Sequence, residues 1–420
     1  MAEFCVPYGR SQLQLWLPDR FAVEVLTPAP VSVVPDPAGA AREAVARPLG
    51  SIRLTDFARA RSVVIAIADK TRPIPNAILL PPLLEALAAA GIPDTAITFL
   101  IATGLHAAMQ PHEFAGLLPE GMLGRFRVIS HDVTDRANMV RLGETSRGTP
   151  VFMNRLFVQA DLRIVVGNID PHQFMGFSGG VKTAAIGLAG LETINANHAL
   201  LLDPRADLAR YEGNPMRQEV EEIGRMAGVH FAVNAVVNEK KQIVAVLAGD
   251  PVEVMRHGIP RVLEIYQVKV AKPFDLMIVS PGGYPKDINL YQGQKALGHA
   301  CRVAPPGSTV ILAAACPEGS GSQSYEDWVR GMESHRAVLD RFKGEGFRIG
   351  PHKAFQFARD ASVRRLLLVT DMPASKTREL LLTKAESLDS AVGLALEGLA
   401  ASARIGVMPW GNSTVPTLAA

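Results

Sequence analysis

Several short apolar runs along the chain have the composition of strands buried in a parallel sheet. β-Branched and other apolar residues dominate 61–69, 95–104, 126–132 and 162–168, and each run ends in glycine or a polar residue. The stretch 77–91 instead has helical spacing and closes with a glycine. Because strands that alternate with helices are typical of α/β layers, the pattern predicts a mostly parallel sheet.

The same pattern begins again in the last third of the chain. Strand-like runs recur at 274–283, 308–316, 364–371 and 403–411. We therefore predict two α/β domains with mostly parallel sheets, separated near the polar stretch 266–273. The first, residues 1–268, would carry the candidate catalytic residues, and the second, residues 269–420, would close over an active-site cleft between them.

Composition and charge exclude several classes of protein. The 420 residues are 48% hydrophobic and 20% charged, with a formal charge of +2, which is typical of a globular protein and gives no electrostatic case for nucleic acid. The first residues contain no basic segment followed by an apolar run, and no apolar stretch is long enough to span a membrane. Cys5, Cys301 and Cys316 are too few and too far apart for a metal knuckle or a disulfide framework. We expect a cytoplasmic protein that binds neither nucleic acid nor membrane.

Polar residues that could carry out chemistry follow the predicted strands. Asp69, Thr71 and Arg72 follow the first run, and His106 and His172 follow the second and the fourth. In the second half, a similar group contains Tyr291, Gln292 and Lys295. Because ligands of α/β proteins bind at the carboxyl ends of the strands, these groups are the candidates for an active site.

A glycine-rich segment, GFSGGVKT at 176–183, comes after the fourth predicted strand. It is close to a phosphate-binding P-loop, but Val181 stands where that motif requires glycine. The segment could therefore be a tight strand-to-helix turn. It could also be an anion site formed by the backbone of Ser178, Gly179 and Gly180, because exposed N–H groups at a helix start attract anions.

Three of the ten histidines stand close to these candidate groups. His106 and His172 follow strands, and His198 follows the glycine-rich segment. An imidazole titrates near neutral pH and suits a general acid or base, and three histidines could also hold the zinc ion of a hydrolase. The residues alone leave both possibilities open.

Lys182 lies in an apolar segment, VKTAAIGLAG. A charged amine buried there would be costly unless it were paired, so this lysine either meets an anion or is covalently modified. Arg72 and Lys295 could hold a carboxylate or a phosphate, or form ordinary ion pairs.

Together, these segments resemble the lactate racemase family, whose members use a nickel-pincer nucleotide. The resemblance rests on residues 167–201, with DKTRPIP at 69–75, TGLH at 103–106 and LYQGQK at 290–295. PYG near the amino terminus also matches, so the shared motifs span nearly the whole chain in the family's order.

The resemblance implies a role for each matching residue. His106 and His172 would be the general acid/base pair, Lys182 would bind the cofactor through a thioamide, and His198 would be the protein ligand to nickel. The remaining positions match family residues around the cofactor (Asp69, Thr71, Arg72, Ser178, Gly179 and Gly180) and the substrate (Arg72, Tyr291, Gln292 and Lys295).

The implied reaction is racemisation or epimerisation of a 2-hydroxy acid by hydride transfer to and from the cofactor. Two histidines would alternate as acid and base, because the two enantiomers present opposite faces. The resemblance also implies contact with cofactor biosynthesis proteins, and the chain could form a homo-oligomer. A zinc-dependent hydrolase and a non-catalytic binding homologue are the alternatives.

The chain departs from the family pattern beside the first catalytic histidine. Family members often have a basic residue there, whereas this chain has Ala107 and Ala108. The substrate could therefore be lactate, another 2-hydroxy acid or a sugar acid. No motif identifies the aromatic residue that would pack on the cofactor, although Trp328, Phe355 and Trp410 are available.

Overall fold

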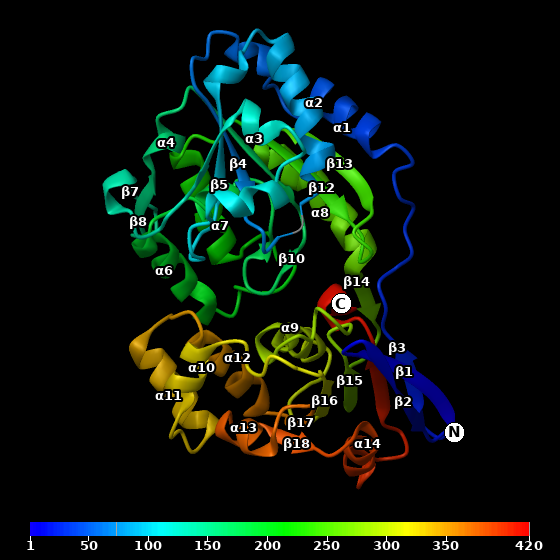
Figure 1. The fold of residues 1–420 in the computed structure, drawn as a ribbon. Coiled ribbons are helices and arrows are strands. Elements are labelled where there is room, and N and C mark those ends of the chain that lie inside the picture. Colours follow the sequence, from blue (N-terminus) through cyan, green and yellow to red (C-terminus); the bar gives the residue numbers. More distant parts are fainter. Residues whose placement is uncertain (73, 420) are drawn as a thin grey trace. The chain divides into compact units, whose positions relative to one another are not determined.

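The computed structural model describes residues 1–72 and 74–419. It divides into two compact units: unit 2 is Pro30–Ile265, and unit 1 combines Met1–Ala29 with Tyr266–Ala420. Within the described residues, each unit contains a six-stranded sheet flanked by helices (Figure 1). The predicted α/β class with mostly parallel sheets is confirmed.

The sheet of unit 2 has the order β13-β12-β9-β4-β5-β6. Strands β12, β9, β4, β5 and β6 run parallel, and β13 is antiparallel to β12. Four of these strands were predicted from the sequence, whereas β12 and β13 were not. Their bounds are β4 Val63–Ala68, β5 Ile97–Ala102, β6 Arg127–Ser130, β9 Leu162–Asn168, β12 Phe231–Val237 and β13 Ile243–Gly249.

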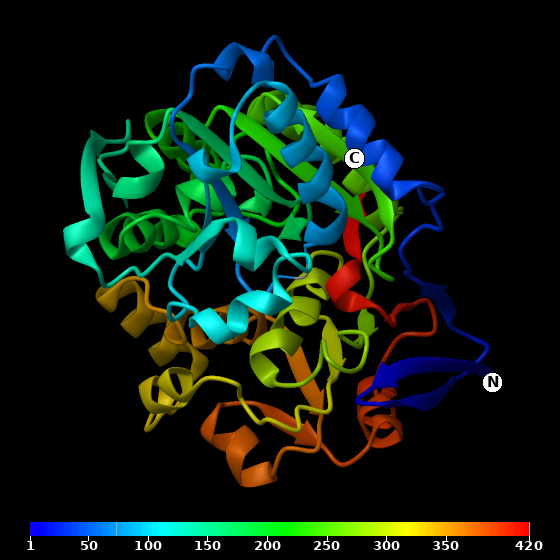
Figure 2. The ribbon, with the colours of Figure 1, turned by 45° about the horizontal axis from the view of Figure 1, so that its top comes forward.

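Strand β4 shows why a near-continuous apolar run forms the centre of this sheet. Val63, Ile65 and Ile67 point to one face and belong to a core cluster with residues of helices α1 (Pro37–Ala46) and α2 (Asn76–Ala89). Helix α5 (Lys182–Ala185) contacts β4 and β9, and α7 (Pro215–Met226) packs against α5. Burial on both faces leaves no place for polar residues within the strand, and each fully buried aliphatic side chain stabilises the fold by ~1.5–3 kcal/mol. Figures 1 and 2 show α1 and α2 lying side by side over the sheet.

The remaining elements of unit 2 lie in the connections between these strands, except α8, which follows β13. Two short antiparallel ribbons, β7–β8 and β10–β11, occur between β6 and α5. The bounds are α3 Met122–Arg125, β7 Met139–Glu144, β8 Pro150–Asn154, α4 Arg155–Val158, β10 Pro171–His172, β11 Gly176–Phe177, α6 Leu191–Ala199 and α8 Pro251–Tyr266.

The strand order creates a switch point between β4 and β9. From β4 the chain adds β5 and β6 on one side, and it returns to add β9 and β12 on the other side. The connections after β4 and β9 therefore leave the sheet in opposite directions. In such sheets, ligands bind beyond the carboxyl ends of the two strands at this point.

The sheet of unit 1 is parallel throughout, in the order β18-β17-β16-β15-β19-β3. Four of these strands confirm the predicted runs in the last third of the chain. The bounds are β3 Ala22–Val25, β15 Leu276–Val279, β16 Thr309–Ala313, β17 Arg365–Val369, β18 Thr383–Ala385 and β19 Arg404–Met408.

The first 29 residues belong with the last third of the chain, which differs from a division into 1–268 and 269–420. Strand β3 pairs with β19 at the edge of the unit 1 sheet. The hairpin of β1 (Ala2–Tyr8) and β2 (Ser11–Leu17) contributes Val6, Leu15 and Leu17 to the core of that unit. These three side chains are fully buried, so the hydrophobic effect holds the amino-terminal segment on unit 1.

The helices of unit 1 follow its strands in sequence. After β15 comes α9 (Leu290–Ala300), which carries one of the predicted groups of polar residues. The other elements are β14 Gln267–Val270, α10 Gln323–Val329, α11 His335–Glu345, α12 Pro351–Ala361, α13 Ala374–Glu379, α14 Leu388–Leu396 and β20 Val415–Leu418.

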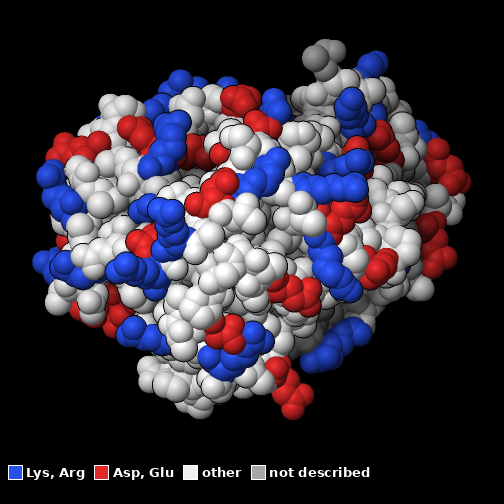
Figure 3. Space-filling view, turned by 90° about the horizontal axis from the view of Figure 1, so that it is seen from above, with Lys and Arg blue, Asp and Glu red and all other residues white. Residues whose placement is uncertain are grey.

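Acidic and basic side chains are interspersed on the molecular face shown in Figure 3. Within the part of the chain that the structure describes, no helix is both long enough and apolar enough to cross a membrane.

Candidate active site

Asp69 and His106 form a hydrogen-bonded pair at the carboxyl edge of the unit 2 sheet. Asp69 follows β4 directly, and His106 follows β5, the neighbouring strand. His106 Nδ1 lies 2.5 Å from Asp69 Oδ2. The carboxylate is buried, with 4% of its side chain exposed, whereas 52% of the imidazole is exposed. The pair therefore has a fixed inner member and an accessible outer member.

The surroundings of Asp69 keep it ionised. Thr71 donates to Asp69 Oδ1 from its hydroxyl, at 2.6 Å, and from its backbone N–H, at 3.1 Å. Burial by itself would raise the pKa of Asp69, but the hydrogen bonds from His106 and Thr71 outweigh burial and lower it. A carboxylate can only accept, so His106 Nδ1 carries the proton and its Nε2 carries the lone pair of a base.

His172 lies in the loop after β9, in the two-residue strand β10. Its Nδ1 accepts the backbone N–H of Met175 at 3.2 Å, an arrangement that requires the neutral imidazole. The ring of Phe174 contacts two histidines, with its centroid 4.6 Å from that of His172 and 5.8 Å from that of His198. Asn214 fixes this loop by donating to Phe174 O at 2.9 Å. Phe174 of this loop thus links two of the predicted histidines, His172 of the same loop and His198 of α6.

The glycine-rich segment forms a tight turn that leads into α5 at Lys182. Gly179 and Gly180 have φ angles of +85° and +56°, which residues other than glycine rarely adopt. A Cβ at Gly179 would lie 2.7 Å from Ile169 Cγ1, and one at Gly180 would lie 2.7 Å from Met255 Cγ. The backbone N–H of Lys182 donates to Gly179 O at 3.3 Å. Conformation and close packing therefore both require glycine at these positions.

Lys182 is buried, with 7% of its surface exposed, and among the described residues no carboxylate pairs with it. Burial lowers the pKa of Lys182 well below its usual value, and the positive charges of Arg72 and Arg217 lower it further. Burial and these charges thus favour the uncharged amine, which is the nucleophilic form. This outcome fits the sequence-based expectation of covalent modification better than that of an ion pair.

His198 lies near the carboxyl end of α6 and close enough to Lys182 for the two groups to interact electrostatically. Burial, with the charge of Lys182, lowers the pKa of His198 to about 3. Its Nδ1 donates to Ile194 O at 2.9 Å, so Nε2 of the neutral ring carries the lone pair. A neutral imidazole with a fixed tautomer is the form that binds a metal ion.

The segment after β5 contacts the end of α5. The backbone N–H of Gly104 donates to Gly187 O at 3.0 Å. This bond ties the TGLH segment, which carries His106, to the residues that follow Lys182. The two sequence motifs are far apart in the chain but share one edge of the sheet.

Other predicted residues of unit 2 lie around the same strand ends. Ser178 Oγ accepts the backbone N–H of Asp170 at 3.0 Å and donates to Asn168 O at 3.2 Å, so it joins the two sides of the loop after β9. Thr71 and Arg72 are exposed at the end of β4.

Tyr291, Gln292 and Lys295 lie on α9 in unit 1. The side chain of Asn289 caps this helix and accepts the backbone N–H of Gln292 at 3.1 Å. The ammonium of Lys353 lies 4.7 Å from the centre of the Tyr291 ring, and burial raises the pKa of Tyr291. These residues belong to a different unit from the histidines and Lys182.

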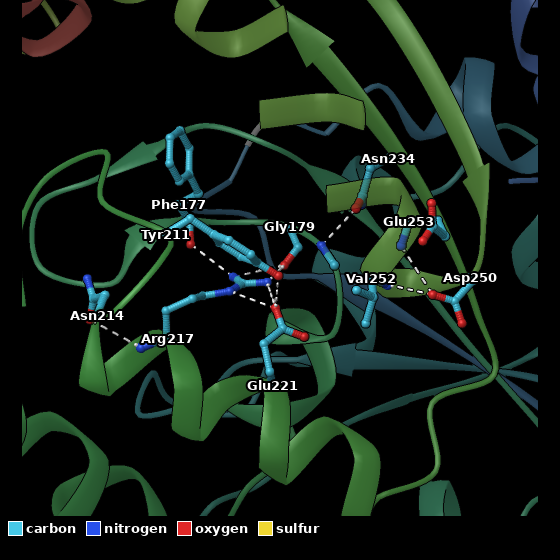
Figure 4. Close-up of polar contacts among 11 residues, drawn as sticks. Phe177, Gly179, Tyr211, Asn214, Arg217, Glu221, Asn234, Asp250, Val252 and Glu253 are labelled. Carbon is cyan, nitrogen blue, oxygen red and sulfur yellow. Dashed lines mark hydrogen bonds and ion pairs between the residues drawn. The ribbon is translucent and has the colours of Figure 1, made fainter. Parts of the chain in front are cut away.

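The structure adds residues that sequence reasoning missed (Figure 4). Arg217 is buried in α7, and Asn214 caps that helix through the backbone N–H of Arg217 at 3.3 Å. Asn234 of β12 accepts the backbone N–H of Gly180 at 2.8 Å. The pair Asn214–Pro215 is a typical helix start, so α7 was open to prediction from sequence. The contacts of Arg217 and Asn234 with the turn depend on the tertiary fold.

The three aromatic residues considered for cofactor packing all lie in unit 1. Trp328 and Phe355 each pack against Phe342, whereas Trp410 is exposed after β19. Among residues 1–72 and 74–419, no three His, Cys, Asp or Glu side chains gather closely enough to hold a metal ion. This finding gives no support to the three-histidine zinc site.

The described geometry combines several chemical functions at one end of the unit 2 sheet. His106 is an imidazole oriented by a carboxylate, His172 is a second imidazole, Lys182 is a buried amine, and His198 is an imidazole with one nitrogen held by a backbone carbonyl. Such a set can move protons and hold a covalently attached group that binds a metal ion.

Comparisons with known proteins agree along the whole chain. The family models "Lactate racemase N-terminal domain" and "Lactate racemase C-terminal domain" match residues 8–209 and 269–415. The lactate racemase of Thermoanaerobacterium thermosaccharolyticum is 30% identical over 424 residues, which cover 99% of each chain. The lactate racemase of Lactiplantibacillus plantarum is 32% identical over 297 residues, which cover 70% of each.

Solved structures give the same result. The lactate racemase apoprotein from T. thermosaccharolyticum superposes with a TM-score of 0.91 at 29% identity, covering 99% of this chain and 100% of that chain. A Thermotoga maritima protein has a TM-score of 0.65 at 17% identity, covering 91% of this chain and 97% of that chain, and shares the fold alone.

Proposed function

The chain belongs to the lactate racemase family, and we propose that it inverts the C2 centre of a 2-hydroxy acid by hydride transfer to and from a nickel-pincer nucleotide. Family membership makes it a racemase, which is an isomerase, and a cofactor-dependent enzyme. The choice of cofactor, the role of each residue and the substrate are parts of the proposal.

The observation that carries the proposal is the burial of Lys182 without a carboxylate partner among the described residues. Burial and the positive charges of Arg72 and Arg217 favour the uncharged amine, which can form a covalent bond. Attachment as a thioamide would remove its charge permanently, and so would remove the cost of burying it. His198 fits the same group, because its Nε2 offers a lone pair close to this amine.

When bound, the nickel-pincer nucleotide would supply an acceptor for the C2 hydride of the substrate. The protein would supply the acid and the base. His106 would take the hydroxyl proton at Nε2, while the Asp69 carboxylate stabilises the imidazolium through Nδ1. Asp69, assigned from the resemblance to the cofactor surroundings, would then act chiefly by positioning His106.

His172 would serve the opposite face of the substrate. In the structure its Nδ1 accepts the Met175 amide, which places the proton of the neutral ring on Nε2. To act as a base, His172 would have to leave this contact so that a lone pair faces the substrate. The two histidines therefore differ in their local contacts, because one faces a carboxylate and the other faces an amide donor.

The substrate and cofactor anions would be held by cationic and polar side chains. Arg72 stands beside the end of β4, and its charge acts on Lys182. On α9, Tyr291, Gln292 and Lys295 offer donors for a carboxylate or a phosphate.

The proposal is tested first by intact-mass spectrometry. Protein made in a host that synthesises the cofactor should carry a covalent adduct, and Lys182→Ala should carry none. Lys240→Ala removes an exposed lysine of the same unit and should keep the adduct. An adduct at full occupancy on Lys182→Ala would remove this lysine from the attachment role.

The second test is a racemisation screen with the loaded protein. Each enantiomer of lactate, longer 2-hydroxy acids and sugar acids is incubated, and its mirror image or epimer is quantified by chiral chromatography. Nickel is measured on the same samples. Loaded protein that inverts no 2-hydroxy acid would contradict the proposed reaction.

A further inference from the structure

We propose that Arg217 is a positioning residue for Lys182, because its buried guanidinium holds the carbonyl groups of the turn from which Lys182 emerges. The inference rests on the proposed role of Lys182 in cofactor attachment. It adds a residue that lies outside every motif identified from the sequence.

The guanidinium contacts the turn at two carbonyl groups (Figure 4). Arg217 Nη1 donates to Phe177 O at 3.0 Å, and both Nη1 and Nη2 donate to Gly179 O, at 3.3 and 3.2 Å. Gly179 O is also the acceptor of the Lys182 backbone N–H. One carbonyl oxygen thus joins the guanidinium to the residue that starts α5.

The guanidinium is itself held in place. Glu221, one turn further along α7, accepts from Arg217 Nε at 2.9 Å and from Nη2 at 2.5 Å. The Tyr211 hydroxyl donates to the same carboxylate at 2.9 Å, and the guanidinium lies 5.2 Å from the centre of the Tyr211 ring. The plane of the fork is therefore fixed by its hydrogen bonds to Glu221 and by the nearby Tyr211 ring before any ligand binds.

Close packing brings α7 to the turn. A Cβ at Gly224 would lie 2.4 Å from Val181 Cβ, so the helix can approach the turn because this position is glycine. At the other side, Asn234 accepts the Gly180 backbone N–H. The peptide group between Gly179 and Gly180 is therefore held from α7 through its carbonyl and from β12 through its N–H, which leaves the turn little freedom to move.

The position of Arg217 is costly for a residue with a purely structural role. Its side chain is 1% exposed, and desolvating a guanidinium is unfavourable unless every donor is engaged. The carboxylate of Glu221 offsets the charge of the guanidinium. The Arg217 N–H groups that face the turn donate instead to backbone carbonyl groups of the turn. Burial lowers the pKa of Lys182, and the positive charge of Arg217 adds to that shift, which agrees with the geometric argument.

Arg217→Lys tests the geometry with the charge retained. An ammonium is a point charge and cannot span Phe177 O, Gly179 O and Glu221 as the planar fork does. In apoprotein, hydrogen exchange at the backbone amides of residues 179–185 should become about 10-fold faster or more, as expected when charge-assisted hydrogen bonds are lost. Exchange in β12 should stay unchanged. Arg225→Lys, at an exposed position of the same helix, is the control. It should leave exchange unchanged both at residues 179–185 and in β12.

A second readout follows cofactor attachment in the loaded protein. The fraction of Arg217→Lys that carries the adduct should fall at least several-fold relative to Arg225→Lys. Unchanged exchange at 179–185 would overturn the proposal, and so would faster exchange spread evenly over the whole unit. If Arg217→Lys does not fold, Glu221→Gln loosens the fork while leaving it in place. Glu221→Gln should also speed exchange at residues 179–185, by a smaller factor than Arg217→Lys. Unchanged exchange there in Glu221→Gln would also overturn the proposal.

The exchange experiment separates this inference from the proposed function. It uses apoprotein and needs no cofactor. If Lys182→Ala retains an adduct, the attachment role fails, while exchange at 179–185 still decides whether Arg217 holds the turn.

Discussion

Asp69→Asn should slow racemisation in both directions without disturbing the fold. In the structure, Oδ1 of this carboxylate accepts two donors from Thr71, and Oδ2 accepts His106 Nδ1. Asparagine keeps the volume but replaces one acceptor oxygen with a donor. Because Thr71 offers two donors, the amide oxygen should stay on that side and the amide nitrogen should face His106.

That orientation would force His106 into its other neutral tautomer. Nδ1 would accept from the amide, so Nε2 would carry the proton and could no longer act as a base. A lost hydrogen bond to a charged group costs ~1.5–3 kcal/mol, and a lost general base costs ~10²–10⁴-fold in rate. Because half of the imidazole is exposed and water screens the pair, we expect the lower end of that range, about 10²-fold in kcat.

Asp132 provides a matched control. Its Oδ1 accepts Thr134 N at 2.8 Å and Thr134 Oγ1 at 2.6 Å, the same local turn as at Asp69. Among the described residues its carboxylate has no hydrogen bond to a histidine, so Asp132→Asn should leave the rate unchanged. Rates are measured by chiral chromatography from each enantiomer, at equal adduct occupancy by intact mass. Wild-type activity in Asp69→Asn, or an equal loss in Asp132→Asn, would refute the reasoning.

Three further predictions follow from burial, backbone conformation and ligand geometry. Gly180→Ala should lower the free energy of unfolding in urea by about 2–5 kcal/mol, because it combines a left-handed φ with overpacking against Met255. The control is Gly91→Ala, which also has a left-handed φ but open space around it, and it should lose only about 1–2 kcal/mol. Equal losses would contradict the packing argument. Burial lowers the pKa of His131 from 6.5 to about 4, so between these pH values the unfolded chain binds a proton at this residue and the native state does not. The free energy of unfolding should therefore fall by up to about 3 kcal/mol as the pH drops from 6.5 toward 4. His131→Asn should show a smaller drop between pH 7 and pH 4.5, and an unchanged pH dependence would exclude this residue as the cause. His198→Ala should lower the nickel content of loaded protein without unfolding it, and unchanged nickel by elemental analysis would mean that another side chain is the ligand.

The sequence by itself determined the strands and the reactive residues. Buried parallel strands need unbroken apolar runs, so β4, β5, β9 and β15 could be located from local composition. The run at β12 is equally apolar and was open to the same argument. His106, His172, Lys182 and His198 were identified because each lies in a motif, and a motif is a local property of the chain.

The tertiary structure alone decided which of these residues act on one another. Asp69 meets His106 because β4 and β5 are neighbours in the sheet, and the spacing of the two residues along the chain does not contain that fact. Arg217 reaches Gly179 O from a helix 38 positions away, in a segment that resembles no motif. Residues 1–29 join the last third of the chain because β3 completes the edge of a sheet whose other strands come some 250 residues or more later. Local spacing encodes which element a residue forms, whereas hydrogen-bond partners are chosen by sheet order and close packing, which arise only when distant segments fold together.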